Sequence, residues 1–115
     1  MGKEKKKAEC YKSIYEPMLN LEIRVYIWEK GEKEYNDLLL KVSGRWLHWE
    51  VGNTITEPIE CDEWWVFWAM WVYDETDYRY FIHELYHLTN AIKETYDLWE
   101  EWWAYLIWWL AGEIL

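Results

Sequence analysis

An uninterrupted apolar run over residues 64–73 constrains the fold of this chain more than any other feature. Asp62 and Glu63 precede the run, and Asp74 and Glu75 follow it. A strand that is buried on both faces is continuously apolar in this way. The run is too short to cross a bilayer as a helix, which needs about 20 residues. We therefore expect a central buried strand here, with a short buried helix as the alternative.

The sequence after this run predicts two helices. Asp74 or Thr76 can cap the first helix, with Asp77 near its first turn, where the helix dipole favours negative charge. This helix should continue to about Thr95 and break at residues 96–97. Beyond the break, apolar residues recur at steps of three and four, which predicts an amphipathic helix to the C-terminus. These residues are Trp99, Trp102, Trp103, Leu106, Leu110 and Ile114.

The first part of the chain begins with a predicted strand and a predicted helix. Residues 21–29 alternate apolar and polar side chains, the period of a half-buried strand. Lys30 and Gly31 should break that strand. Residues 32–42 then carry apolar side chains at helical spacing, and Ser43-Gly44 offers a C-terminal cap.

Alternation returns in residues 45–51 and predicts a second strand, with Gly52-Asn53 as the turn after it. Together these elements predict an α+β domain. Its small mixed or antiparallel sheet would pack on the two C-terminal helices.

Length, charge and cysteine usage limit the class of protein. The chain has 115 residues and a net charge of -10, which fits one domain over residues 10–115 and argues against binding to nucleic acid. Residues 1–9 carry the basic run KEKKK, which we expect to be a flexible solvated tail rather than a targeting signal. Cys10 and Cys61 lie far apart without Cys-x-x-Cys spacing, so we expect ordinary thiols and a cytoplasmic location. The apolar stretches are too short to cross a bilayer, so we expect no transmembrane segment.

The chemistry of the chain is concentrated in the sequence His83-Glu84-Leu85-Tyr86-His87. Four residues along a helix correspond to roughly 40° of rotation and 6 Å of rise, so the two imidazoles share one face and can bind one ion. Glu84 lies beside that face and can reach a metal-bound water without being a ligand. The H-E-x-x-H spacing therefore predicts a zinc site with His83 and His87 as ligands and Glu84 as general base.

A catalytic zinc also needs a third protein ligand and an open position for water. Glu94 shares the helical face but lies roughly 10 Å too far along the axis. Glu101, early in the last helix, is the preferred ligand, with Glu100 as an alternative. An early end of the first helix would bring Glu101 to the right level. If both helices run straight to the turn, Glu113 becomes the rival.

Residues 64–115 resemble the minimal gluzincin-like zinc peptidase domains of phage and mobile-element proteins and of small bacterial regulatory peptidases. The resemblance rests on the His83–His87 motif and on a weaker Glu-x-x-Ala pattern at residues 101–104. It implies a zincin-like fold and zinc-dependent hydrolysis of a peptide or protein substrate. It also implies that a strand near residues 66–72 pairs with the extended substrate.

Other readings of the aromatic and histidine residues remain open. Tyr80, Tyr86 or Tyr105 could donate to an oxyanion beside the zinc, although each also suits core packing. His48 is isolated on its predicted strand and is interpreted as structural. The chain contains 12 Trp and 10 Tyr, which suggests self-association through a tryptophan-rich surface. The alternative function is therefore a non-catalytic interaction or assembly module, stabilised by zinc or by aromatic packing, whose composition would also fit an engineered variant.

Overall fold

The computed structural model describes residues 11–48, 50–74 and 76–114, so the predicted tail and Cys10 lie outside the described residues. The chain is α+β, as the sequence predicted. Its elements are β1 (Tyr11–Glu16), β2 (Leu21–Ile27), α2 (Trp28–Ser43), β3 (Gly52–Thr54), β4 (Ile59–Glu60), β5 (Val66–Val72), α3 (Tyr78–Tyr96) and α4 (Glu100–Ile114).

Strand β5 is the centre of a mixed sheet with the order β1-β2-β5-β3. It pairs in parallel with β2 on one edge, and antiparallel with β3 and β4 on the other. Phe67 to Val72 are all buried, because neighbouring side chains point to opposite faces and both faces are covered. The predicted buried strand is therefore confirmed.

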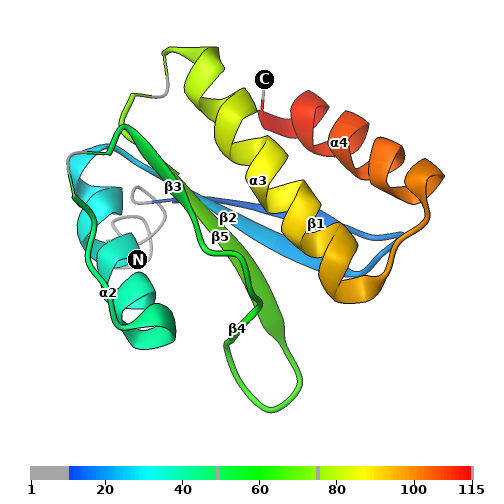
Figure 1. Ribbon diagram of the computed structural model, residues 1–115, viewed down its shortest axis with the longest axis horizontal. Coiled ribbons are helices and arrows are strands. Elements are labelled where there is room, and N and C mark those ends of the chain that lie inside the picture. Colours follow the sequence, from blue (N-terminus) through cyan, green and yellow to red (C-terminus); the bar gives the residue numbers. More distant parts are fainter. Residues whose placement is uncertain (1–10, 49, 75, 115) are drawn as a thin grey trace, which may run out of the picture.

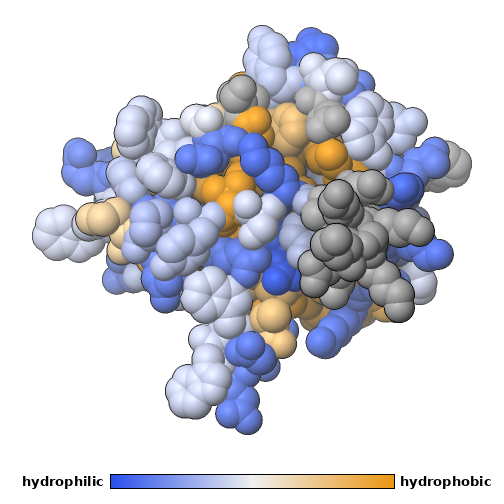
Figure 2. Space-filling view, turned by 180° about the vertical axis from the view of Figure 1, so that it is seen from behind, coloured by the Kyte–Doolittle hydropathy of each residue, from blue (hydrophilic) through white to orange (hydrophobic). Residues whose placement is uncertain are grey.

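Helices cover both faces of this sheet (Figure 1). Helices α3 and α4 lie on one face over Ile23, Trp68 and Met70. Helix α2 lies on the other face and packs with Tyr26 and Trp71. Seen from behind, hydrophobic residues gather near the middle of the molecule with hydrophilic residues around them (Figure 2). The sheet thus separates two hydrophobic cores, one on each of its faces.

Strand β2 and helix α2 differ from prediction at their junction. The strand ends at Ile27 and the helix begins at Trp28, so Gly31 lies inside the helix and does not mark the boundary between the two elements. Gly31 is buried. The predicted C-terminal cap is confirmed, since Gly44 adopts φ 73° and donates its backbone N–H to the carbonyl oxygen of Leu40.

The predicted strand over residues 45–51 is wrong. In the described part of this segment there is no strand, and the backbone N–H of Leu47 donates to the side-chain oxygen of Asn36 at 3.0 Å. The strand forms instead over residues 52–54, where a turn was expected, because the free edge of β5 lies there. Strand β1, which the alternation did not reveal, pairs antiparallel with β2. Strand positions here follow the available pairing edges more than local alternation.

Helices α3 and α4 form an antiparallel pair (Figure 1). Asp77, and not Asp74 or Thr76, caps α3, since its carboxylate accepts from the backbone N–H of Arg79 at 3.1 Å. The helix continues without interruption to Tyr96, so the early end that would have favoured Glu101 as a ligand does not occur.

The described surface carries several exposed tryptophans. Trp64 is 89%, Trp99 79% and Trp108 70% exposed. Cys61 is a free, exposed thiol. Among the helices that are described, none has both the length and the apolar character needed to span a membrane.

A buried carboxylate joins the β1–β2 turn to helix α4. Glu16 is 0% exposed and accepts from the backbone N–H groups of Met18 at 2.9 Å and Leu19 at 2.6 Å. The hydroxyl of Tyr105, on α4, donates to the same carboxylate at 2.5 Å. Burying a charge is tolerable only when donors surround it, so Glu16 fixes α4 against the end of the hairpin.

We expect Glu16→Ala to lower the free energy of unfolding by about 2–3 kcal/mol, because it leaves two backbone donors without a partner. Urea denaturation followed by tryptophan fluorescence measures this loss. Tyr105→Phe, which removes one of the three donors, should cost less. Equal stability of wild type and Glu16→Ala would contradict this role.

Candidate metal centre

The two histidines of the motif converge on the flank of α3 that faces β3. Their Nε2 atoms lie 3.3 Å apart, and the rings meet edge to face with centroids 4.8 Å apart. Both side chains are exposed to solvent. One turn of helix therefore presents two ring nitrogens at nearly the same point, as the spacing predicted.

This separation can be compared with the geometry of zinc. Zinc binds imidazole nitrogen at about 2.0–2.1 Å and prefers tetrahedral coordination, which puts two ligand nitrogens about 3.3 Å apart. The Nε2 atoms of His83 and His87 are 3.3 Å apart. The pair therefore fits two neighbouring ligand positions on one ion.

Strand β3 fixes the carboxylate of Glu84 beside this pair. Glu84 is 6% exposed, and its Oε1 accepts a hydrogen bond from the hydroxyl of Thr54 at 2.8 Å. Its Oε2 lies 4.0 Å from His83 Nε2. A Cβ on Gly52 would come within 2.6 Å of the same Oε2, so the carboxylate lies directly over the glycine backbone. Only glycine leaves room for Glu84 in this position.

Burial raises the pKa of Glu84 above its ordinary value. The hydrogen bond from Thr54 and the proximity of His83 and His87 act in the opposite direction, and Glu50 adds to the increase. A carboxyl group whose pKa moves toward neutrality is a stronger base, and it matches proton transfer near neutral pH better. This electrostatic setting is consistent with the predicted role of Glu84 as general base.

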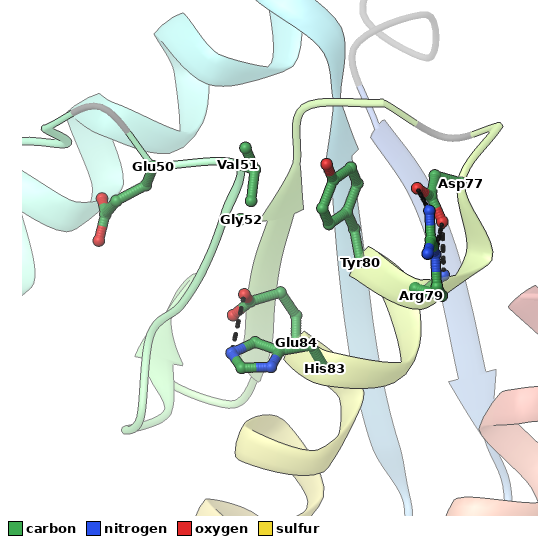
Figure 3. A pocket seen from close by; sticks show the side chains of 8 residues that line it. All are labelled: Glu50, Val51, Gly52, Asp77, Arg79, Tyr80, His83 and Glu84. Carbon is green, nitrogen blue, oxygen red and sulfur yellow. Dashed lines mark hydrogen bonds and ion pairs between the residues drawn. The ribbon is translucent and has the colours of Figure 1, made fainter.

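A cleft of about 670 Å³ opens beside Glu84 between α3 and the segment that leads into β3. Figure 3 shows His83 and Glu84 on one wall and Glu50 and Val51 on the other. At one end, the carboxylate of Asp77 pairs with Arg79, with 2.9 Å between Oδ2 and Nη2. A smaller adjoining pocket reaches His87. The imidazole pair and Glu84 therefore line a cavity that is accessible from solvent.

The structure does not bring Glu101 to the imidazole pair. Glu101 is exposed on α4, which lies along one flank of α3, while β3 and the cleft lie along the other (Figure 1). Glu100 and Glu113 belong to the same helix and are also exposed. Throughout the described ranges, no three His, Cys, Asp or Glu side chains lie close enough to hold one metal ion. The structure thus assembles two of the three predicted ligands.

The three candidate tyrosines have separate surroundings. Tyr80 lines the cleft. Tyr86 is exposed and meets the ring of His87 at a centroid distance of 5.6 Å. Tyr105 donates to Glu16 and belongs to the contact between α4 and the β1–β2 turn. His48, predicted to be a structural residue on a strand, is exposed in a segment without regular structure.

Sequence reasoning missed the residues on β3 that hold Glu84. Gly52 was interpreted as part of a turn, and Thr54 carried no recognisable motif. The signal that could have revealed them is a short strand with glycine two residues before threonine. In such a strand both residues face the same side of the sheet, and here both contact Glu84.

The fold and the cleft define a small α+β protein with two convergent imidazoles beside a buried carboxylate. Comparison of the chain with protein-family models, curated proteins and solved structures gives no match.

We expect Gly52→Ala to displace Glu84 and to lower the free energy of unfolding by about 1–3 kcal/mol, because the added methyl group would overpack a buried site. Its Cβ would lie 2.6 Å from Glu84 Oε2 and 2.8 Å from Cγ. The control is Gly112→Ala on α4, where the added Cβ would meet nothing within 4 Å. This substitution should stabilise the helix, because alanine has a higher helix propensity than glycine. Combining Gly52→Ala with Glu84→Ala should recover part of the loss in urea denaturation, and failure to recover any would contradict the contact.

We also expect Glu84→Gln to stabilise the metal-free protein at pH 7, since the amide removes the cost of burying a charge. Because the pKa of Glu84 is raised in the folded state, folding favours its protonated form. The free energy of unfolding of the wild type should therefore rise relative to that of the variant as pH falls from neutral toward about 4.3, the ordinary pKa of Glu. Urea denaturation at several pH values with a chelator present tests this, and a difference that does not change with pH would contradict it.

Proposed function

We propose that this chain is a zincin-like zinc-dependent peptide hydrolase. The observation that carries the proposal is the 3.3 Å separation of the Nε2 atoms of His83 and His87, next to the buried carboxylate of Glu84. Neutral imidazole is among the preferred ligands of zinc, and a neighbouring carboxylate that is not a ligand is the usual base in such sites. The four-residue spacing of the two histidines on α3 and the cleft beside them support this chemistry better than a structural role for the histidines.

His83 and His87 would hold the ion. A zinc ion bound there would polarise the substrate carbonyl and make a water molecule more acidic. The position of Glu101 on the far flank of α3 gives that residue no support as a ligand in this arrangement. The proposal therefore assigns two protein ligands from α3 and leaves the other positions to water and substrate.

Strand β3 is the edge at which an extended peptide can bind. The expected pairing with residues 66–72 is wrong, because β5 already pairs with β2 on one edge and with β3 and β4 on the other. Among the described strands, β3 pairs with β5 alone. Its other edge can accept a substrate strand by backbone hydrogen bonds, next to the cleft that His83 and Glu84 line.

Glu84 would move the proton in this reaction. Its carboxylate takes a proton from the attacking water and later gives that proton to the amide nitrogen of the leaving group. Tyr80, which lines the cleft, is the best placed of the three candidate tyrosines to donate a hydrogen bond to the carbonyl oxygen.

Metal content and peptide turnover, measured on the same samples, test the proposal. We expect about one zinc per chain in the wild type, loss of the metal in the His83→Ala/His87→Ala double variant, and retention in Glu101→Gln. Glu84→Gln should keep the metal and lose at least about 100-fold in turnover, because it removes the base. Elemental mass spectrometry after identical dialysis gives the metal content, and a mixed peptide library gives the turnover.

A second candidate function is an interaction module that uses zinc or aromatic packing for stability. It is favoured by the exposure of Trp64, Trp99 and Trp108, which is unusually high for this residue type. Zinc in both wild type and Glu84→Gln, with no turnover in either, would support this candidate against the hydrolase. Negligible zinc in the wild type would overturn both uses of the metal.

A further inference from the structure

We infer that Thr54 is a positioning residue that orients Glu84 so that Oε2 is the oxygen that takes the proton. The inference rests on the proposed function, and it assigns separate tasks to the two oxygens of one carboxylate. It follows from contacts that β3 makes with α3, outside the His-Glu-x-x-His motif itself.

The first observation is the hydroxyl of Thr54. It lies 2.8 Å from Glu84 Oε1 and 3.1 Å from the backbone carbonyl oxygen of Glu84. A hydroxyl has a single proton, so Thr54 donates to one of these acceptors at a time or is shared between them. The shorter contact is the one to Oε1, and donation to this oxygen limits rotation of the carboxylate.

The second observation is the closeness of Gly52. A Cβ on Gly52 would come within 2.6 Å of Glu84 Oε2, so this oxygen occupies space that a side chain at residue 52 would fill. Thr54 and Gly52 are two residues apart on one strand and face the same side of the sheet. Strand β3 therefore holds Oε1 through a hydrogen bond and leaves room for Oε2 at Gly52.

The consequence is a difference between the two oxygens. Oε1 already accepts from Thr54, whereas Oε2 lies on the side of the imidazole pair, 4.0 Å from His83 Nε2. Oε2 thus retains lone pairs toward the place where a water would be held. In the proton transfer the O–H bond of that water breaks, the proton goes to Oε2, and the electron pair stays on the water oxygen as it attacks the carbonyl carbon.

The same strand would then serve two purposes. Its free edge would hold the substrate backbone, and its Thr54 side chain holds the base. A displacement of about 1 Å at a catalytic group can lower a rate by about 100-fold. Strand β3 would therefore set the position of both the substrate and the base relative to the imidazole pair.

Three substitutions at two threonines test this role. Thr54→Val keeps the shape and removes the hydroxyl, Thr54→Ser keeps the hydroxyl, and Thr95→Val makes the same change at an exposed site near the end of α3. We expect Thr54→Val to lower kcat by about 10- to 100-fold with KM and zinc content unchanged. Thr54→Ser should recover most of kcat, and Thr95→Val should behave as wild type. An unchanged kcat in Thr54→Val, or no recovery in Thr54→Ser, would overturn the inference.

A readout without turnover separates this inference from the proposed function. The carboxyl carbon of Glu84 can be assigned by 13C NMR from the resonance that disappears in Glu84→Gln. We expect this resonance to shift in Thr54→Val and to return near its wild-type position in Thr54→Ser. If the wild type cleaves no peptide but the resonance behaves in this way, the hydrolase proposal fails and the contact stands. A resonance that is unchanged in Thr54→Val would overturn the contact itself.

Discussion

The burial of β5 on both faces and both edges is the constraint on which the rest of the structure depends. A strand with apolar side chains on both faces must be covered on each side, and α2 supplies one cover while α3 and α4 supply the other. Full burial of a large apolar side chain contributes about 1.5–3 kcal/mol. Trp68, Met70 and Trp71 are all buried on this strand. Their burial contributes more free energy than the secondary-structure propensities of single residues.

The position of the site follows from this arrangement. Strand β5 leads directly into α3, and β3 pairs with the last residues of β5, so the start of α3 must pass close to β3. Glu84 is where the two elements meet, over Gly52 and against Thr54. Burial there raises the pKa of Glu84, so its charged form costs stability near neutral pH.

The pattern of apolar residues predicted those elements in which the segment's own sequence is enough to indicate helix or strand. Helical spacing predicted α4, and the apolar run predicted β5. Prediction failed where a strand depends on a partner that is distant in the sequence. Residues 45–51 alternate as a strand should, yet the edge of β5 pairs with residues 52–54. Gly31 was expected to separate the strand from the helix, but it lies buried within α2, where tertiary packing outweighs a low helix propensity.

By itself, the sequence determined how the three motif residues of the candidate site lie relative to one another. Residues four apart on any helix share a face, so the convergence of His83 and His87, with Glu84 beside them, required no knowledge of the fold. Only the tertiary structure decided which elements surround them. It placed Gly52 and Thr54 against Glu84, and it placed Glu101 on the opposite flank of α3. The physical reason is that helical geometry acts over a few residues, whereas the neighbours of a helix flank are set by packing across the whole sheet.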